Sequence, residues 1–450
     1  MYKIILAFRF LLKRRITYFA LLSVALCVFI VVVVMTVMTG LVSNFKHKNH
    51  DFVGDCIVGT ESLVGFAYYE DFLTILEQQK DFVQAVSPVI KSYALVNIRN
   101  RDLHYGLEVL GIDPVKHSLV TDFENTIHYH KGDVSKAFMP FYDPNLLGCI
   151  LGIDRAFNRG SNGNYYFDFT APRTSFSISC FPLTSRGALS KASTGLVNTK
   201  TFYFSDTSQS GLAHVDYSTI YLPFEWAQRL CGMDGAIKRV SAIYIKFRPD
   251  IKLQEGCEKV TLLWKKYKQE KVDQAQAYLL DAVNIQNWKN YRRSVIAPME
   301  QEQAMMSVMF AFVGITTVFI VFVTFYMIIS HKSKDIGILK SIGASNVDII
   351  ELFSGFAFLV GLVGSGVGIF GGWLFLQKIN HIENWLFEHF QFQLWDRTIY
   401  AIGDIPNEVN PKVLGVIVLS AIVSCLVGGL LPSRQAANSA PAETLQVNQL

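Results

Sequence analysis

The chain has 450 residues, of which 51% are hydrophobic and only 17% are charged. A mean hydropathy of +0.28 is too high for an ordinary soluble protein and indicates a membrane protein. The formal net charge is +4, and no stripe rich in Lys and Arg alternates with aromatic residues. This pattern excludes the electrostatic footprint of a nucleic-acid-binding protein.

Four stretches without a charged residue are long enough to cross a bilayer, which takes about 20 apolar residues. They are residues 16–43, 304–330, 352–376 and 413–432. The sequence therefore predicts a multi-pass α-helical membrane protein with four transmembrane helices. The first stretch is about twice as long as the apolar region of a signal peptide, so we expect it to remain as an uncleaved anchor.

The basic residues near the ends of these stretches predict the orientation in the membrane. They lie before the first stretch, between the second and the third, and after the fourth: Arg9, Lys13, Arg14, Arg15, Lys332, Lys334, Lys340 and Arg434. Both termini are therefore expected in the cytoplasm. The predicted division is an N-terminal part with the first helix, residues 1–43, an extracytoplasmic domain, residues 44–302, and a permease part with three helices, residues 303–450.

The segment of residues 44–302 is long enough to fold as a domain of its own. Residues 94–98 and 242–247 are rich in β-branched and aromatic side chains, which predicts strands. Residues 69–79 and 253–268 place apolar side chains at helical spacing. We therefore expect a large α+β domain between the first and second helices, with loops at the polar stretches 158–164 and 184–199.

Five of the seven cysteines fall in this segment: Cys56, Cys149, Cys180, Cys231 and Cys257. An odd number leaves at least one of them unpaired, and the spacing fits no zinc site. We expect scattered buried thiols rather than a disulfide framework, although the disulfide state stays open. His128 and His130 lack a third ligand nearby, so we expect solvated loop histidines and neither a metal site nor a cofactor.

The motifs of an enzyme are missing from the sequence. It has no nucleophile elbow, no His-Glu-x-x-His and no Ser-x-x-Lys pattern, and without a Gly-Lys dipeptide it has no Walker A loop. We therefore expect a non-catalytic membrane subunit and ATP hydrolysis, where it is needed, on a separate chain.

Small residues recur every four positions in the last two predicted helices. Such rows let helices approach closely in lipid, where packing drives association. We expect them to form a helix-packing face, either between these two helices or with a partner permease, although glycine is common in any transmembrane helix. The residues are Gly364, Gly368, Gly372, Ser420, Ser424 and Gly428.

The connection between the second and third helices predicts a short amphipathic helix. Ile336, Leu339 and Ile342 recur at intervals of three and would lie roughly along one face. Such a helix either docks in a groove of a cytosolic partner or lies at the lipid headgroups with its lysines on phosphates.

The same connection carries a resemblance to a known family. Residues 334–345, KDIGILKSIGAS, resemble the motif between the second and third helices of FtsX-type permeases, also called the MacB or type VII ABC family. The order of one helix, a large ectodomain and three helices is similar as well. Further segments look most like the lipoprotein-releasing permeases of the LolC/LolE type: residues 10–15, 34–41, 209–230, 302–306, 400–406 and 432–445.

The resemblance implies a transporter of the bacterial inner membrane that works without catalysis of its own. A LolD-like cytosolic ABC ATPase would dock on the connection, and a second permease, either another copy or a sister chain, would complete the complex. The ectodomain would be MacB-like and would pass lipoproteins to a periplasmic carrier. The implied coupling helix comprises Asp335, Ile336, Gly337, Leu339, Lys340, Gly343, Ala344 and Ser345.

The resemblance also implies an apolar cavity, open to membrane lipid, between the first and second helices. Methionines near the outer ends of these helices are flexible and polarizable, which suits variable acyl chains. These candidate residues are Met35, Met38, Met305, Met306 and Met309. Two alternatives remain: a MacB-like efflux or mechanotransmission permease, and an FtsX-like signalling protein that controls cell-wall hydrolases.

Overall fold

The computed structural model describes residues 15–98, 104–158, 165–167, 171–190, 197–331, 333–390 and 404–438. The segments 10–14, 400–403 and 441–445, on which part of the resemblance rests, lie outside these ranges. The chain divides into two compact units. Residues 44–297 belong to one, and the other comprises the chain up to residue 43, residues 298–395 and the chain from residue 404 onward.

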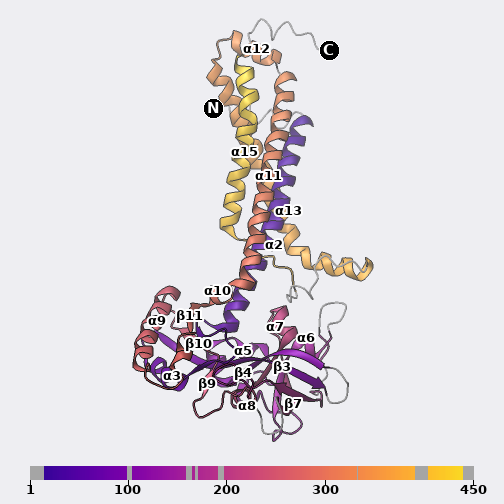
Figure 1. Ribbon diagram of the computed structural model, residues 1–450. Helices are drawn as coiled ribbons and strands as arrows, with labels where there is room; N and C mark the ends of the chain where they lie inside the picture. Colours follow the sequence, from indigo (N-terminus) through magenta and orange to yellow (C-terminus); the bar gives the residue numbers. More distant parts are fainter. Residues whose placement is uncertain are drawn as a thin grey trace. The chain divides into compact units, whose positions relative to one another are not determined.

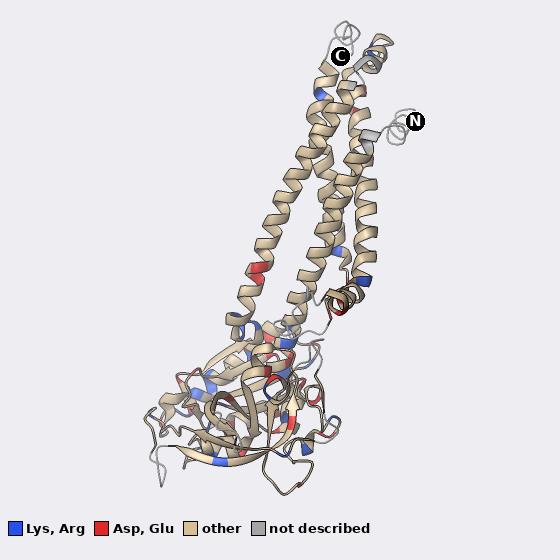
Figure 2. Ribbon diagram, turned by 90° about the vertical axis from the view of Figure 1, so that its right-hand side faces the viewer, with Lys and Arg blue, Asp and Glu red and all other residues tan. Residues whose placement is uncertain are grey.

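Four long helices account for the membrane part. They are α2 (Arg15–Val53), α11 (Arg293–His331), α13 (Asn346–Phe390) and α15 (Pro411–Asn438). Each contains an apolar window long enough to cross a membrane, and Figure 2 shows few charged residues along them. The four predicted helices are thereby confirmed, with the large domain between the first and the second.

The helices pack around a shared apolar core. Val24, Val28 and Val32 of α2 recur every four residues and so lie on one face of that helix. They meet Phe325 of α11 and Phe356 of α13 in one buried cluster. The ring centroids of the two phenylalanines are 5.3 Å apart. Packing of this kind holds helices together in lipid, where burial from water contributes little.

Residues 44–297 build an α/β domain around one mixed sheet (Figure 1). The described strands follow the order β11 (Asn284–Asn287), β1 (Cys56–Gly59), β10 (Ala242–Phe247), β3 (Val83–Ile98), β4 (His104–Ile112), β8 (Thr219–Pro223), β5 (Gly148–Gly152), β7 (Asn198–Ser208) and β6 (Ser175–Cys180). Two pairings, β4 with β8 and β5 with β7, are parallel. The strands predicted at residues 94–98 and 242–247 are confirmed within β3 and β10.

The long strand β3 belongs to two parts of this sheet. Its first half pairs with β10, and its second half pairs with β4 on one side and β6 on the other. The pairings thus close a ring of β3, β4, β8, β5, β7 and β6, while β10, β1 and β11 extend from it as an open sheet. A closed ring leaves no free strand edge.

Two helices cover the open part of the sheet, and both were predicted. Phe72 of α3 (Tyr69–Gln78) packs against Trp264 of α9 (Leu253–Glu270), with ring centroids 4.7 Å apart. The shorter elements are β2 (Phe66–Ala67), β9 (Arg239–Val240), α4 (Pro114–Val120), α5 (Phe123–Thr126), α6 (Ile153–Ala156), α7 (Ala213–Ser218), α8 (Phe224–Leu230), α10 (Trp288–Tyr291) and the 3-10 turns η1 (Val134–Lys136) and η2 (Ala277–Leu280).

The residues that follow α2 are tied to the residues that precede α11. Asp55 is hydrogen-bonded through Oδ1 to Nε2 of His50 at 2.8 Å, and its Oδ2 accepts from the backbone N–H of Phe247 at 2.8 Å. Its carbonyl accepts from the N–H of Trp288, the first residue of α10, at 3.0 Å. One residue therefore joins the last turn of α2, strand β10 and the start of α10.

The prediction of solvated histidines was wrong at His130. His130 is only 9% exposed, and its Nδ1 lies 3.1 Å from Oδ2 of Asp206. The Asp206 carboxylate also accepts from the backbone N–H groups of His128, Tyr129 and His130 at 2.8 to 3.0 Å. Asp206 is fully buried and distant in sequence, so the local pattern carried no sign of this partner.

His117 gives the domain a predictable response to acid. It is 2% exposed, lies between Phe123 and Tyr244, and contacts Oγ of Ser87 at 3.3 Å. Burial lowers the pKa of His117 to about 3. Below about pH 6.5, His117 takes up a proton in the unfolded chain but not in the folded chain. The free energy of unfolding therefore falls as the pH drops.

We expect the free energy of unfolding to fall by about 2 kcal/mol between pH 7 and pH 5 through His117 alone. His117→Gln removes this titration and should flatten the pH dependence of thermal unfolding, measured by tryptophan fluorescence in detergent. His104→Gln, at an exposed position of β4, is the control and should keep the slope of the parent protein. Identical slopes in the parent and in His117→Gln would show that another group causes the acid response.

Candidate functional site

The predicted connection between the second and third helices forms a helix and a tight turn. The helix is α12 (Ser333–Ser341), which includes Asp335. Gly343 has a φ of +105°, a conformation that side chains rarely adopt, and its N–H donates to the carbonyl of Lys340 at 3.0 Å. The N–H of Ala344 donates to the carbonyl of Leu339 at 3.0 Å. Glycine at this position therefore ends α12.

Ser345 then starts the next helix. Its Oγ accepts from the N–H of Asp348 at 3.2 Å, and its own N–H donates to Oδ2 of Asp348 at 3.0 Å. This reciprocal pair is a capping box, which satisfies N–H groups left free at a helix start. The run Gly343, Ala344 and Ser345 thus has a structural explanation as helix stop, turn and helix start.

Ile336, Leu339 and Ile342 do not lie along one face of the helix, as the sequence predicted they would. Ile336 is 3% exposed and packs with Ile349 and Phe353 of α13 and with Ala436 and Ala437 of α15. Lys340 supports this face by donating from Nζ to the carbonyl of Ala437. The side of α12 that faces away from the bundle is left exposed.

The exposed apolar residues of this segment are Ile338 and Ile342, which are 49% and 79% exposed. An interval of six residues turns a helix by about 120° away from the starting direction, so Ile336 and Ile342 do not share a face. An interval of four residues brings side chains onto one face, which explains the pair Ile338 and Ile342. Leu339 is half-buried between the two faces.

An apolar cavity of about 410 Å³ lies between α2, α11 and α15. Most of its few polar groups are bonded within their own helices: Oγ1 of Thr317 donates to the carbonyl of Val313 at 2.9 Å, and it contacts Sγ of Cys27 at 3.0 Å. The cavity therefore offers hydrocarbon surface rather than hydrogen-bonding groups. Its lining includes Val24, Val31, Met35, Phe310, Ala421 and Ser424.

The structure separates the five candidate methionines. Met35 lines the cavity, whereas Met38 and Met306 are half-buried elsewhere. Met305 and Met309 are 57% and 60% exposed on the outer side of α11. Only Met35 is therefore placed to contact a molecule inside this cavity, and the role of all five residues stays a prediction.

The glycine row of α13 packs against α2. A β-carbon at Gly364 would lie 2.9 Å from a methyl group of Val24, and one at Gly372 would lie 3.1 Å from a methyl group of Val32. At Gly368 it would lie 2.6 Å from the carbonyl oxygen of Ala25. The row thus faces α2. The sequence had predicted that it packs against the fourth helix or against a partner permease.

The fourth helix uses its small residues against other neighbours. A β-carbon at Gly428 would lie 2.7 Å from the carbonyl oxygen of Val318 in α11. Ser420 and Ser424 line the apolar cavity, and Oγ of Ser420 donates to the carbonyl of Ile417 in its own helix. α13 and α15 contact each other through other small residues, among them Gly361, which lies against Cys425, and Gly429, which lies against Ala357.

We expect Gly368→Val to loosen the contact between α2 and α13. The added side chain meets backbone atoms of α2 that cannot move alone, and overpacking of this kind typically costs about 1 to 3 kcal/mol. Gly366→Val is the matched control, because it makes the same change in the same helix where nothing lies within 4 Å. Thermal unfolding in detergent should show a lower Tm for Gly368→Val only; equal Tm values would contradict the packing role.

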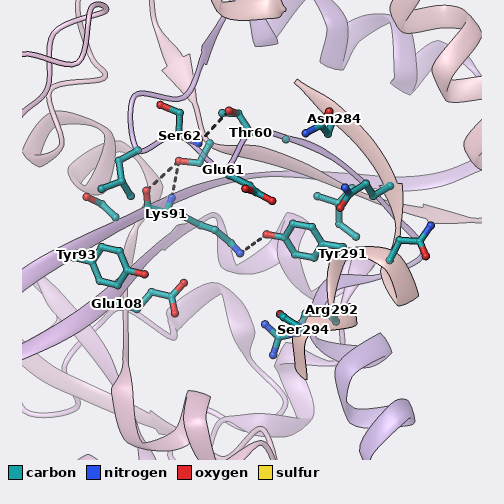
Figure 3. Close-up of a pocket in the computed structure, with 17 residues that line it drawn as sticks. Thr60, Glu61, Ser62, Lys91, Tyr93, Glu108, Asn284, Tyr291, Arg292 and Ser294 are labelled. Carbon is teal, nitrogen blue, oxygen red and sulfur yellow. Dashed lines mark hydrogen bonds between the residues drawn. The ribbon is translucent and has the colours of Figure 1, made fainter. Parts of the chain in front are cut away.

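A second cavity, of about 510 Å³, lies in the domain of residues 44–297 and is polar (Figure 3). Nζ of Lys91 points across it to the hydroxyl of Tyr291, to which it donates a hydrogen bond. Two basic residues, Lys91 and Arg292, and two acidic residues, Glu61 and Glu108, line the cavity. The formal charges of these four side chains cancel.

The segment around Ser210, which carries part of the resemblance, is organised by the buried carboxylate of Asp216, a residue of the same segment. Oδ1 of Asp216 accepts from the N–H and the Oγ of Ser210, both at 2.7 Å, and Oδ2 accepts from the N–H of Gly211 at 3.1 Å. Burial raises the pKa of Asp216 to about 6. Ser210, Gly211 and Asp216 therefore form a local structural motif at the start of α7.

No cluster of three or more His, Cys, Asp or Glu suited to a metal ion occurs among the described residues. The features left as candidates for function are the exposed face of α12 and the apolar cavity. Together with the fold, they define the class as a multi-pass membrane protein with a large extramembrane α/β domain.

Comparison with known proteins agrees with this class. Residues 307–441 match the FtsX-like permease C-terminal family, so the chain carries an FtsX-like permease domain. It is 24% identical over 162 residues to the lipoprotein-releasing system transmembrane protein LolC of Xylella fastidiosa, and 28% identical over 170 residues to LolC of Neisseria meningitidis. These matches cover 36% and 37% of this chain and 39% and 40% of the relatives.

Two further likenesses are broader in coverage. The chain is 26% identical over 231 residues to an uncharacterized ABC transporter permease of Methanocaldococcus jannaschii, over 51% of each protein. The periplasmic region of MacB from Actinobacillus actinomycetemcomitans is similar over 55% of this chain and 95% of that structure, with 10% identity and a TM-score of 0.30. The matches to LolC span about two fifths of the length of those relatives.

Proposed function

We propose that this chain is the membrane subunit of an ABC complex that extracts lipoproteins from the outer leaflet of the bacterial inner membrane. It hands them to a periplasmic carrier, and a separate cytosolic ATPase supplies the energy. The observation that carries the proposal is the FtsX-like permease domain together with the likeness to LolC proteins. Both termini lie in the cytoplasm, and residues 44–297 lie in the periplasm.

The exposed face of α12 is the docking site of the ATPase in this proposal. Ile338 and Ile342 present two apolar side chains, and an amphipathic helix docks in a groove by such anchors. The opposite face, with Ile336, is fixed to α13 and α15, so a force on α12 reaches both helices. The chain itself performs no catalysis, and a second permease, either another copy or a sister chain, completes the complex.

The apolar cavity is the site of the lipid chains in this proposal. Its lining consists mainly of aliphatic and aromatic side chains, and the hydroxyls of Ser307, Thr317 and Ser420 are hydrogen-bonded within their own helices. Burial of an acyl chain here therefore leaves these three hydroxyls with their partners. Met35 contributes a flexible side chain that adapts to chains of different length.

The proposal is tested by purifying the chain in mild detergent and identifying what accompanies it by mass spectrometry. Recovery of a P-loop ATPase together with acylated lipoproteins supports lipoprotein release. Recovery of the ATPase without lipoproteins would favour an efflux or signalling permease instead. Recovery of neither would overturn the assignment to an ABC complex.

Ile342→Asp should abolish recovery of the ATPase, because a charge on the apolar anchor opposes its burial in a groove. Ser341→Asp places the same charge on the neighbouring exposed residue and serves as the control. We expect at least a tenfold loss of bound ATPase for Ile342→Asp and little change for Ser341→Asp. Equal recovery with both variants would show that α12 is not the docking site.

Ala421→Phe should reduce recovery of lipoproteins while leaving the bound ATPase unchanged, because the ring fills the cavity. Val423→Phe adds a phenylalanine on the same helix at a side chain that is 50% exposed outside the cavity, and it serves as the control. Undiminished lipoprotein recovery with Ala421→Phe would remove the cavity from the transport path. Thermal unfolding of both variants verifies that they fold.

A further inference from the structure

Four of the five cysteines in the domain of residues 44–297 lie in two pairs. Cys56 begins β1 and Cys257 lies in α9, and the two thiols are close enough to interact. Cys180 ends β6 and Cys231 caps α8, and these two thiols are also close enough to interact. The sequence predicted scattered thiols, because residues about 200 and 50 positions apart give no local sign of pairing.

The packing around the first pair supports this placement independently. Gly256, which precedes Cys257, lies against the ring of Phe247, where a β-carbon would be 2.5 Å from a ring atom. The backbone N–H of Phe247 donates to Asp55, the residue before Cys56. Phe247 therefore contacts the neighbours of both cysteines and packs α9 against β10, the strand beside β1.

The second pair is held by Asn198. Cys180 is paired with Asn198 in the register of β6 and β7. The side-chain amide of Asn198 donates to the carbonyls of Arg229 and Leu230, at 3.3 and 3.2 Å, directly before Cys231. The N–H of Leu183 donates to the carbonyl of Cys231 at 3.3 Å. Both strands around Cys180 are thus fixed to the end of α8.

We propose that the mature protein carries two disulfides in this domain, Cys56–Cys257 and Cys180–Cys231, and that Cys149 remains a thiol. The proposal rests on the periplasmic location in the proposed function, because disulfides persist in oxidising compartments. Cys149 is fully buried in β5, and no other thiol contacts it among the described residues. Burial raises the pKa of Cys149, which opposes formation of the reactive thiolate.

Each bond would form by thiol–disulfide exchange with a disulfide-bearing oxidant of the periplasm. One cysteine thiolate attacks the oxidant and forms a mixed disulfide, and the second thiolate displaces the oxidant from it. Two thiols of this chain thereby lose two electrons and two protons, and the disulfide of the oxidant becomes two thiols. Because Cys56 and Cys180 are fully buried in the folded domain, the exchange takes place during folding.

The experiment is disulfide mapping on the full-length protein, inserted into the inner membrane and purified without reductant. Free thiols are alkylated under denaturing conditions, and the digested protein is analysed by mass spectrometry. We expect the linked peptides Cys56–Cys257 and Cys180–Cys231, with Cys149 alkylated. Full alkylation of all five cysteines, or links between other partners, would overturn the proposal.

Two variants sharpen the result. Cys56→Ser should release Cys257 for alkylation, preserve the Cys180–Cys231 link and lower the Tm by about 5 to 10 °C. Cys149→Ser, the matched control, should leave both links in place. A Cys56→Ser protein in which Cys257 stays protected from alkylation would contradict the assigned pairing.

The location of the domain is measured separately. Val115 is 49% exposed, and Val115→Cys in whole cells should react with a membrane-impermeant maleimide that reaches the periplasm. Labelling without either link would overturn the disulfides and leave the proposed location intact. Absence of both labelling and links would overturn both.

Discussion

The hydrogen bonds of Asp55 are the constraint on which the extramembrane domain depends. Its carboxylate and backbone join His50 at the end of α2, Phe247 in β10 and Trp288 at the start of α10. β1 and β11 continue this junction as neighbouring antiparallel strands, with Cys56 opposite Asn287. The segment that follows the first long helix is thereby fixed to the segment that leads into the second. One segment cannot move relative to the other without breaking several of these hydrogen bonds.

Features that depend on local sequence were predictable, and features that depend on distant partners were not. The four membrane helices follow from uninterrupted apolar length, α3 and α9 follow from side-chain periodicity, and β3 and β10 follow from their β-branched and aromatic residues. The sequence predicted Ile336 and Ile342 on one face of the helix, but six residues turn a helix by about 120° away from the starting direction, and only Ile336 is buried. The partner of Gly368, the carboxylate that binds His130 and the contact between Cys56 and Cys257 each join residues far apart in sequence. A single sequence contains no record of such pairings.

Within the membrane unit, contacts connect α12 to α2 through α13. Ile336 anchors α12 to the start of α13, and the glycine row farther along α13 lies against Val24, Val28 and Val32 of α2. The backbone of α2 then continues to Val53. A displacement of α12 would therefore be passed along α13 to the part of α2 that lies in the membrane unit. Close backbone contact at the glycines suits this role, since it allows little relative sliding.

The packing of α11 differs along its length, which bears on how the cavity could open. Val318 and Val321 lie against Gly428 of α15, and Phe325 is fully buried against α13. Before Gly314, whose surroundings are open, the exposed side chains are Met305, Val308, Met309 and Phe312. Before Gly314, α11 is joined to α2 by a hydrogen bond from Nε2 of Gln303 to Oγ1 of Thr39 at 3.4 Å. Widening of the cavity between α2 and α11 would therefore break this bond, while the contact of α13 with α2 could stay intact.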